Sequence, residues 1–438
     1  MFSFFYDFFL HIAALFYAPI FLFQWLFRGK YRKNIKQRLG LALPRMRIKN
    51  KEFVVWFHAP SLGETKAIAP LIALMRLNMP KATIMVSNVT ETGHAAAVAS
   101  LKDADYHFYL PLDLPYLINP LVDSIKPDLI IISETDFWYN FLKRATDKGA
   151  RVVVVNGKIS ERSLRRFNIL PWVMAPLFQL IDLICPQNED YKDRFMRLGI
   201  PPDHLYVTGN LKLDDASTNL SEKAVGEWKK KLGVHKDDFL LVIGSTHHPE
   251  EKQLIHVLKK VWKKCPGLKV ALAPRHPERF KTVASYLESI KMPFATYSAE
   301  EQFNKQTNLM LFDEMGILRE LYQVGDMAIV AGSYTDKVGG HHLLEPSLYG
   351  KPVLFGPHTQ SQSEMAFMMK KAEAGKQVSL DKLGEAIVDL ISHPEKRKKM
   401  GAAGIKMFAE AKGATERTWQ LLRVMISQIL WEKEEGHL

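Results

Sequence analysis

Short apolar runs alternate with longer helical stretches along most of the chain. In the first half such runs occur at Phe53–His58, Ala82–Ser87, Asp128–Ser133 and Arg151–Asn156. They lack strict alternation of apolar and polar residues, as is typical of strands buried on both faces of a sheet. Each run is followed by polar or glycine-containing residues and then by a helical pattern, which indicates βαβ units. The first half therefore predicts a parallel, doubly wound sheet.

The same pattern starts again after the polar stretch Leu211–Val234. Further strands are predicted at Phe239–Gly244, Leu268–Ala273, Asn308–Phe312, Asp326–Ala331 and Pro352–Phe355. The tail from Pro394 onward is predicted to be helical, and its apolar face would consist of Trp419, Leu421, Leu422, Met425 and Ile429. Because 438 residues are too many for one ordinary domain, the pattern indicates an α/β protein with two Rossmann-like domains.

These patterns give the expected division of the chain. Residues 1–30 form an N-terminal membrane anchor and 31–220 the first Rossmann-like domain. Residues 221–405 form the second Rossmann-like domain, and 406–438 a C-terminal helix that packs back on the first domain.

The stretch Phe8–Phe27 is apolar and about long enough to cross a bilayer as a helix. A helix lying in the plane of the interface is an open alternative, because the stretch is rich in aromatic residues and contains Pro19. A cleaved signal peptide is disfavoured, because the charges follow the apolar segment and no small-residue cleavage site is present. The basic residues that follow are Arg28, Lys30, Arg32, Lys33, Lys36 and Arg38. They place that end on the cytoplasmic side and could contact anionic headgroups.

The charge and cysteine content narrow the choice of partners. A net charge of +12 and a pI of about 9.3 favour an anionic partner, such as nucleic acid, phospholipid or a phosphorylated or carboxylated substrate. A basic surface without any specific ligand is equally compatible with these values. Cys185 and Cys265 match no metal-binding spacing and are interpreted as buried apolar residues rather than a disulfide.

Ligands of open α/β sheets bind at the carboxyl ends of the strands, so the residues after each strand are informative. In the first half these include Ser61, Gly63 and Glu64 in HAPSLGE, Glu134 in SETDFWYN, Arg162 in NGKISERS and Lys212 in TGNLKLD. Glu64 could act as a base near a helix N-terminus, or only complement the helix dipole. Lys212 could reach a donor phosphate, or be a solvated lysine.

In the second half, Ser245 and Thr246 lie between a strand and a helix and could hold an anion. The adjacent His247 and His248 do not share a helix face, so a zinc site is disfavoured. Arg275 and His276 end the next strand, and arginine there could pair with a phosphate or carboxylate. In the stretch Ala331–His358, Gly339 and Gly340 would let the backbone approach a ligand and start a helix, and Glu345 within that helix suits the ribose hydroxyls of a nucleotide.

Taken in order, these motifs resemble those of the 3-deoxy-D-manno-octulosonic acid (Kdo) transferases of lipid A and lipopolysaccharide biosynthesis. The matching segments run from RLG (Arg38–Gly40) to FGPH (Phe355–His358) and include TETG, PLDLP, PRHPERF and GGHHLLEP. The resemblance implies a GT-B fold, with two Rossmann-like domains facing a central cleft. It also implies an inverting glycosyltransferase with CMP-Kdo as donor and a lipid A precursor (lipid IVA) as acceptor. Neither a cofactor nor a metal is implied, and the expected location is the cytoplasmic face of the bacterial inner membrane.

The resemblance also implies roles for individual residues. Glu64 matches the general base and Glu134 a second acid, while Ser61, Gly63 and Arg162 match the acceptor side. The positions implied for CMP binding are Lys212, Ser245, Thr246, Arg275, His276, Met315, Gly316, Gly340, His341 and Glu345. Three positions depart from the family pattern: Pro60 in the first motif, Ile317 in place of an acid, and His342 in place of an amide. The motifs do not fix how many Kdo residues are added.

Two other functions fit parts of the pattern. A nucleotide-sugar epimerase could use the same fold, but a soluble sugar nucleotide would not need a membrane anchor. A noncatalytic binder of membranes or nucleic acid would fit the charge, but would not need acidic residues at the strand ends.

Overall fold

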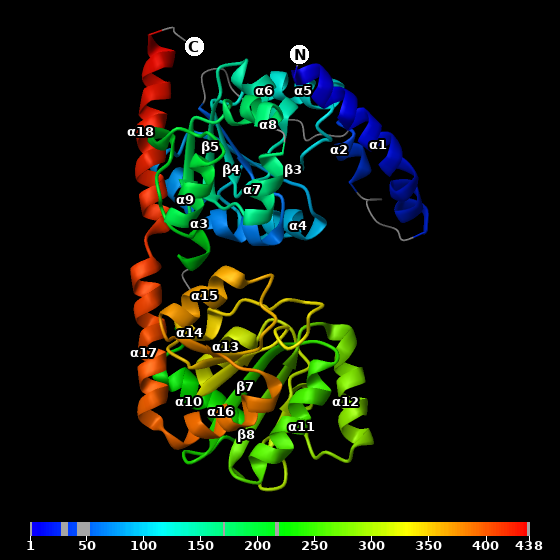
Figure 1. Cartoon of the computed structure of the whole chain (residues 1–438), viewed down its shortest axis with the longest axis vertical. Coiled ribbons are helices and arrows are strands. Elements are labelled where there is room, and N and C mark those ends of the chain that lie inside the picture. Colours follow the sequence, from blue (N-terminus) through cyan, green and yellow to red (C-terminus); the bar gives the residue numbers. More distant parts are fainter. Residues whose placement is uncertain (1, 28–33, 42–52, 170, 215–218, 436–438) are drawn as a thin grey trace. The chain divides into compact units, whose positions relative to one another are not determined.

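The structure is a computed structural model that describes residues 2–27, 34–41, 53–169, 171–214 and 219–435 (Figure 1). Four of the basic residues expected at the membrane surface, Arg28, Lys30, Arg32 and Lys33, lie outside the described residues. The chain divides into two compact units. The first comprises Met1–Ala216 and Ala411–Leu438, and the second Ser217–Glu410.

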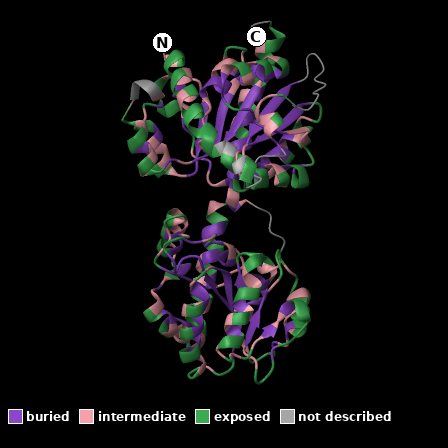
Figure 2. Ribbon diagram, turned by 90° about the vertical axis from the view of Figure 1, so that its right-hand side faces the viewer, coloured by how far each residue is buried: buried purple, intermediate pink, exposed green. Residues whose placement is uncertain are grey.

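The first unit is built on a parallel sheet of six strands in the order β3-β2-β1-β4-β5-β6. The strands are β1 (Val54–His58), β2 (Thr83–Asn88), β3 (Tyr106–Tyr109), β4 (Leu129–Ser133), β5 (Arg151–Gly157) and β6 (Leu183–Pro186). The helices after them are α3 (Leu62–Asn78), α4 (Glu91–Ser100), α5 (Pro115–Ile125), α6 (Tyr139–Thr146), α7 (Glu161–Phe167), α8 (Pro171–Phe178) and α9 (Glu189–Met196). Residues of α3 and α4 share one core cluster with the sheet, and residues of α5, α6 and α9 share the other. Helices therefore cover both faces, and the strands are buried (Figure 2).

The second unit has a parallel seven-stranded sheet in the order β13-β12-β11-β7-β8-β10-β9. Its strands are β7 (Phe239–Thr246), β8 (Leu268–Pro274), β9 (Ala295–Thr296), β10 (Leu309–Leu311), β11 (Met327–Val330), β12 (Val353–Phe355) and β13 (Gly375–Gln377). Its helices are α10 (Glu222–Leu232), α11 (Glu250–Trp262), α12 (Phe280–Ser289), α13 (Leu318–Val324), α14 (Glu345–Leu348), α15 (Ser363–Lys371), α16 (Leu380–Ser392) and α17 (Pro394–Ala411). Both units are thus doubly wound α/β domains, which confirms the predicted fold class.

All nine strands expected from the apolar runs are present, and four further strands were missed. The missed strands are β3, β6, β9 and β13, and each lies at an edge of its sheet. An edge strand has one neighbour and can be short, so it needs no long apolar run; β9 has only two residues. The pattern therefore identified the interior of each sheet but not its borders.

The predicted helical tail is two helices rather than one. Gly413, with φ of 87°, separates α17 from α18 (Ala414–Glu434), because this left-handed conformation ends the first helix. The carboxylate of Asp214 accepts hydrogen bonds from the backbone N–H groups of Gly413 and Thr415, at 2.8 and 2.5 Å, and so caps the start of α18. Of the predicted apolar face, Trp419, Leu422 and Ile429 are buried in the core of the first unit.

Replacing Leu422 by Ala tests how much α18 stabilises the first unit. Leu422 is fully buried in the core cluster that α18 shares with α3, so its loss should lower the free energy of unfolding by about 2–5 kcal/mol. Leu430→Ala on the same helix is the matched control, because Leu430 is 40% exposed and should cost far less. Urea denaturation monitored by tryptophan fluorescence measures the free energy of unfolding of both variants. Equal midpoints for the two variants would mean that α18 adds little to the core.

Candidate active site

The first candidate residues lie where β1 passes into α3. Ser61 is the N-cap residue, with extended backbone, and its N–H donates to Glu64 Oε2 at 2.8 Å. Glu64 lies in the first turn of α3 and is 9% exposed. This arrangement satisfies an N–H group that the helix leaves free, and it fixes the direction of the carboxylate. Capping and catalysis are therefore compatible for Glu64, since a carboxylate has two oxygens and the Ser61 N–H bonds to Oε2.

Glu64 opens onto a cavity of about 380 Å³ at the carboxyl ends of the strands. The cavity is lined by Pro60, Ser61, Glu64, Val89, Thr90, Thr135, Asp136 and Trp138. These residues come from the loops that follow β1, β2 and β4, which the sheet order makes neighbours. Of the expected acceptor-side residues, Ser61 and Glu64 line this cavity. Gly63 does not, and Arg162 is exposed on α7.

Glu134 lies directly after β4 and is held by two lysines. Its side chain is buried, and its oxygens accept hydrogen bonds from Lys158 and Lys212, each at 2.6 Å. Burial alone would raise the pKa of Glu134, but the two ammonium groups outweigh burial and lower it. Glu134 is therefore an ionised acceptor of hydrogen bonds. The structure places Lys212, which was expected on the donor side, within this first-unit cluster.

The cluster around Glu134 also sets the electrostatic environment of Glu64. Lys212 Nζ lies close to Gly63, 3.7 Å from where a Cβ would be. Burial raises the pKa of Glu64, and the negative charge of Glu134 raises it further. The hydrogen bonds from Ser61 and the charge of Lys212 oppose this rise without cancelling it. A carboxylate with a raised pKa is a better proton acceptor near neutral pH.

Sequence reasoning missed a chain of hydrogen bonds that ends at Asp136. Trp56 Nε1 donates to Ser87 Oγ at 2.7 Å, and Ser87 Oγ lies 2.8 Å from Nδ1 of the fully buried His58. His58 Nε2 lies 3.2 Å from Asp136 Oδ2, which also accepts from Trp138 Nε1 at 3.0 Å. An ionised carboxylate can only accept a hydrogen bond, so His58 Nε2 carries a hydrogen and donates it to Asp136.

This chain makes Asp136 a fixed, ionised group in the cavity. Burial would raise the pKa of Asp136, but the hydrogen bonds from His58 and Trp138 lower it on balance. The Asp136 side chain is 35% exposed, so it can still accept a hydrogen bond from a ligand. The signal in the sequence was a histidine and an aspartate at two strand ends that neighbour each other in the sheet.

In the second unit, a buried carboxylate joins two of the expected donor-side loops. Glu250 is fully buried and accepts from the N–H groups of His247, Gly332 and Tyr334 at 2.8–2.9 Å. These groups belong to the loops that follow β7 and β11. Glu250 therefore holds both loops through their backbone N–H groups. The sequence analysis did not identify Glu250 as important.

The rings of three histidines contact one another at these loops. His247 Nε2 and His341 Nε2 are 2.7 Å apart with stacked rings, and His276 lies edge-on to His247 with ring centroids 5.1 Å apart. Burial, followed by the charges of His247 and Arg275, lowers the pKa of His341 to about 4. Burial and the charge of His276 also lower the pKa of His247. With lowered pKa values, His247 and His341 each keep one N–H group; one of these bridges the two Nε2 atoms, and the other can donate a hydrogen bond to an anion.

The remaining donor-side residues differ in exposure and in backbone conformation. Ser245 has φ of 61° at the end of β7, and Thr246 donates to Glu251 at 3.2 Å. Arg275 and Met315 are exposed, and Gly316 has φ of 92°. No group of three His, Cys, Asp or Glu residues suited to a metal ion occurs in the described part of the chain.

The stretch Ala331–His358 differs from its expected form. Gly340 is buried and donates to Gly332 O at 2.8 Å, so it belongs to a loop and does not start a helix. Helix α14 begins only at Glu345, which is therefore its first residue rather than an interior one. Arg319 Nε lies 3.7 Å from Glu345 Oε1. The helix prediction failed because Gly339 and Gly340 both have positive φ, which a right-handed helix excludes.

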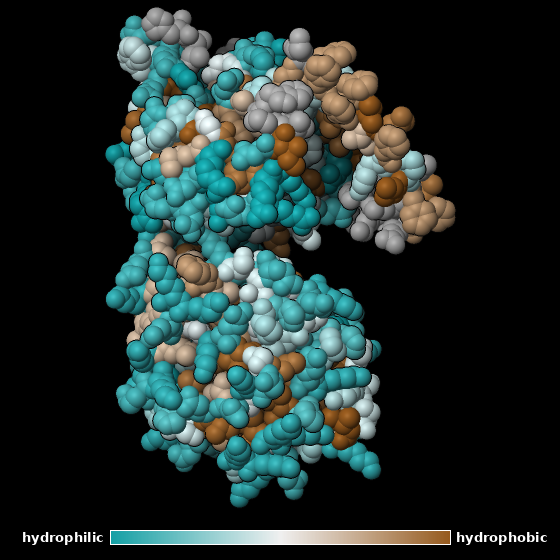
Figure 3. All heavy atoms as spheres, viewed as in Figure 1, coloured by the Kyte–Doolittle hydropathy of each residue, from teal (hydrophilic) through white to brown (hydrophobic). Residues whose placement is uncertain are grey.

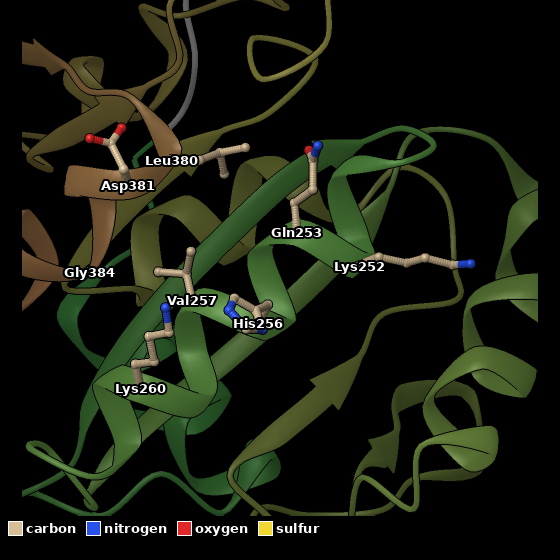
Figure 4. Close-up of a pocket in the computed structure, with 8 residues that line it drawn as sticks. All are labelled: Lys252, Gln253, His256, Val257, Lys260, Leu380, Asp381 and Gly384. Atoms are coloured by element: carbon tan, nitrogen blue, oxygen red, sulfur yellow. The ribbon is translucent and has the colours of Figure 1, made fainter.

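A second cavity, of about 470 Å³, lies between α11 and α16 (Figure 4). It is lined by Lys252, Gln253, His256, Val257, Lys260, Leu380, Asp381 and Gly384. None of these residues comes from a loop that follows a strand. The cavity is therefore separate from the candidate site residues.

Comparison with known proteins agrees with the motifs. A family model described as 3-Deoxy-D-manno-octulosonic-acid transferase (kdotransferase) matches residues 33–215. A 3-deoxy-D-manno-octulosonic acid transferase of Chlamydia muridarum is 35% identical over 97% of this chain and 97% of its own length. The chain belongs to the Kdo transferase family. A transferase of the same name from Haemophilus influenzae is 32% identical and aligns with 84% of this chain and 86% of its own.

Solved structures support the fold of this Kdo transferase. A UDP-GlcNAc 2-epimerase from Neisseria meningitidis aligns with a TM-score of 0.58, at 16% identity, over 87% of this chain and 100% of its own. A glycosyltransferase from Rickettsia africae aligns with a TM-score of 0.57, at 14% identity, over 87% and 99%. Together with the two parallel sheets, these neighbours show the GT-B type of fold.

The charges beside Glu64 predict how the pH dependence of this Kdo transferase responds to mutation. If Glu64 must be ionised, kcat/KM falls as the pH drops through its raised pKa. Glu134→Gln removes a negative neighbour, lowers that pKa and should move the acid limb to lower pH. Lys212→Met removes a positive neighbour and should move the limb to higher pH. Initial rates over a pH series measure the position of the acid limb for both variants. Glu222→Gln is the control, because Glu222 is an exposed glutamate in the first turn of α10. Shifts in the same direction would contradict this arrangement of charges.

Proposed function

We propose that the chain transfers Kdo from CMP-Kdo to a lipid A precursor, lipid IVA, with inversion at the anomeric carbon. The observation that carries the proposal is Glu64, a carboxylate with a raised pKa that is fixed by its cap and faces a cavity large enough for a sugar. Membership in the Kdo transferase family supports the class of sugar transferred.

In the proposed reaction, a hydroxyl of the acceptor lies in the cavity against Glu64. Its oxygen forms a bond to the anomeric carbon of Kdo while its proton passes to the Glu64 carboxylate. The bond between the anomeric carbon and the phosphate oxygen of CMP breaks, and CMP leaves with the electron pair. Asp136 accepts a hydrogen bond from a neighbouring hydroxyl and orients the sugar.

The remaining candidate residues receive supporting roles. Glu134, Lys158 and Lys212 together carry one carboxylate and two ammonium groups, so the cluster leaves one net positive charge for an anionic group of a substrate. In the second unit, Ser245, Thr246, Arg275, His276, Met315, Gly316, Gly340 and His341 would hold CMP, and Glu345 would bind its ribose hydroxyls. Backbone N–H groups and Arg275 stabilise the negative charge of the leaving CMP.

The proposed location is the cytoplasmic face of the bacterial inner membrane. The helix α1 (Phe2–Phe27) is long and apolar enough to associate with a bilayer, and basic residues follow it in the sequence. A lipid acceptor requires an enzyme that works at a membrane surface.

The function is tested by incubating the purified full-length protein with CMP-Kdo, generated in place, and tetra-acylated lipid A precursor. Mass spectrometry should show products heavier by one or more Kdo units. Release of CMP without a heavier lipid, or an isomerised sugar nucleotide, would overturn the proposed acceptor or the proposed reaction.

Glu64→Gln should reduce transfer by a factor of about 100 or more, because the amide cannot accept the proton. Its side chain can still accept the hydrogen bond from Ser61, so the fold and the affinity for CMP should remain close to those of the unmodified protein. Transfer is followed by mass spectrometry and CMP binding by calorimetry. Full activity of Glu64→Gln would remove Glu64 as the base.

Asp136→Asn should raise KM for the lipid acceptor while leaving the affinity for CMP unchanged. The amide weakens the hydrogen bonds from His58 and Trp138 and cannot offer an ionised acceptor to the sugar. Asp123→Asn is the matched control, because Asp123 pairs with Arg144 on the helices and lies outside the cavity. A loss confined to kcat, with KM for the acceptor unchanged, would argue against a binding role for Asp136.

A further inference from the structure

The helix α1 is attached to the first unit near its start. Tyr6 donates to Asp113 Oδ2 at 2.8 Å, and Asn140 Nδ2 donates to Asp7 Oδ1 at 2.7 Å. The rings of Phe2 and Tyr139 meet edge to face, with centroids 4.6 Å apart. Figure 1 shows this end of α1 beside α5 and α6. The first two turns of the helix are thus bound to the same unit that carries Glu64.

The attachment site on the first unit is the buried carboxylate of Asp113 with its hydrogen-bond donors. Asp113 is 1% exposed and also accepts from the backbone N–H groups of Asn140 and Phe141, at 2.9 and 2.8 Å. Tyr6 completes this set of donors, so withdrawing α1 would leave a buried carboxylate with one partner fewer. The aromatic ring of His11, one turn further along, lies 5.8 Å from that of Tyr116. One face of the first three turns is therefore occupied by protein.

The chain that follows α1 returns to the same unit. Tyr109 N–H donates to Gln37 Oε1 at 3.1 Å, and Asn34 Nδ2 donates to Glu91 at 3.3 Å. Arg38, which was expected to meet lipid headgroups, instead donates to the carbonyl of Val89 and lies over the ring of Tyr109. Lys36 is exposed and remains free to face an anionic surface. The start of α1 and the segment that follows the helix, residues 34–41, are therefore both bound to the first unit.

Beyond its attached first turns, α1 is exposed: every residue from 13 to 20 is exposed, and the large exposed side chains of the helix are apolar. Side chains exposed by 41–76% are Phe4, Phe5, Phe8, Phe9, Leu15, Phe16, Tyr17, Ile20, Phe23, Leu26 and Phe27. Figure 3 shows this hydrophobic surface extending along the helix. Such a surface is stable against the acyl chains of a lipid leaflet and unfavourable in water.

We propose that α1 lies in the plane of one leaflet and does not cross the bilayer. A helix of 26 residues is about 39 Å long and could span a hydrocarbon core of about 30 Å. Crossing would place Tyr6 and Asp7 on the far side, or within the lipid, and break their bonds to Asp113 and Asn140. In the plane of the leaflet, the exposed apolar side chains enter the acyl region, while the first turns stay bound to the first unit on the same side of the membrane. This topology rests on the membrane association proposed above.

Labelling of a single cysteine near the start of α1 tests the topology. Cys265 is replaced by Ser, Cys185 is left because it is buried, and exposed Ser3 is changed to Cys. In spheroplasts of a bacterial host, a membrane-impermeant maleimide should label Ser3→Cys only after permeabilisation, as it should the control Lys230→Cys on α10. Labelling of Ser3→Cys in intact spheroplasts would show a spanning helix and overturn the proposal. Recovery of the protein entirely in the soluble fraction would overturn the membrane association itself.

Depth measurements on spin-labelled protein in liposomes give an independent result. Labels replace Phe4, Leu15 and Phe27, which are all exposed and lie near the start, middle and end of α1. A helix in the plane should place all three at similar depth, measured by collision with oxygen and with a water-soluble nickel complex. A spanning helix would put Leu15 deepest and the other two near opposite surfaces. That profile would contradict the proposal while leaving the transfer assay unaffected.

Discussion

The structure around Glu64, the proposed base, depends on one buried negative charge and the two lysines that hold it. Glu134 follows β4, Lys158 follows β5, and Lys212 belongs to a short helical turn, so one carboxylate joins three separate segments. A buried carboxylate without such partners would be costly, so these ion pairs stabilise the three segments against one another. Glu134 has φ of 67°, and this left-handed conformation turns its side chain toward the lysines. The next strand end repeats the arrangement: Asn156, with φ of 56°, accepts from Leu211 N–H at 3.0 Å and positions the turn that carries Lys212.

Glu64 and Glu134 therefore differ in chemistry although both are acidic residues at strand ends. Glu134 is bonded to two cations and has a lowered pKa, which suits an electrostatic role. Glu64 is hydrogen-bonded to Ser61, has no cation bound directly to it among the described residues, and has a raised pKa, which suits proton transfer. The negative charge of Glu134 contributes to the raised pKa of Glu64, so the two carboxylates are coupled. Environments that shift the pKa values of two acidic groups in opposite directions commonly give the two groups separate roles.

The sequence predicted the central strands and the residues that follow them, because buried parallel strands need long apolar runs and the sheet order brings their carboxyl ends together. It could not predict the edge strands, nor that Lys158 would share Glu134 with Lys212, because that contact depends on the path of the chain between β6 and α10. Asp136 and Glu250 were missed for a related reason. Their importance comes from hydrogen bonds to His58 and to the backbone of distant loops, and no local pattern reveals such bonds.

The departure from the family pattern at Pro60 affects a position where the backbone, rather than the side chain, makes the contacts. The carbonyl of Pro60 accepts from the N–H groups of Val89 and Thr90, at 3.2 and 2.9 Å, and from the Thr90 hydroxyl at 3.0 Å. It thereby joins the loops after β1 and β2 that form one wall of the cavity. Proline lacks only the N–H group, which takes no part in these bonds. The exchange at this position is thus compatible with the same cavity, and the position of Glu64, four residues later, is preserved by its own cap.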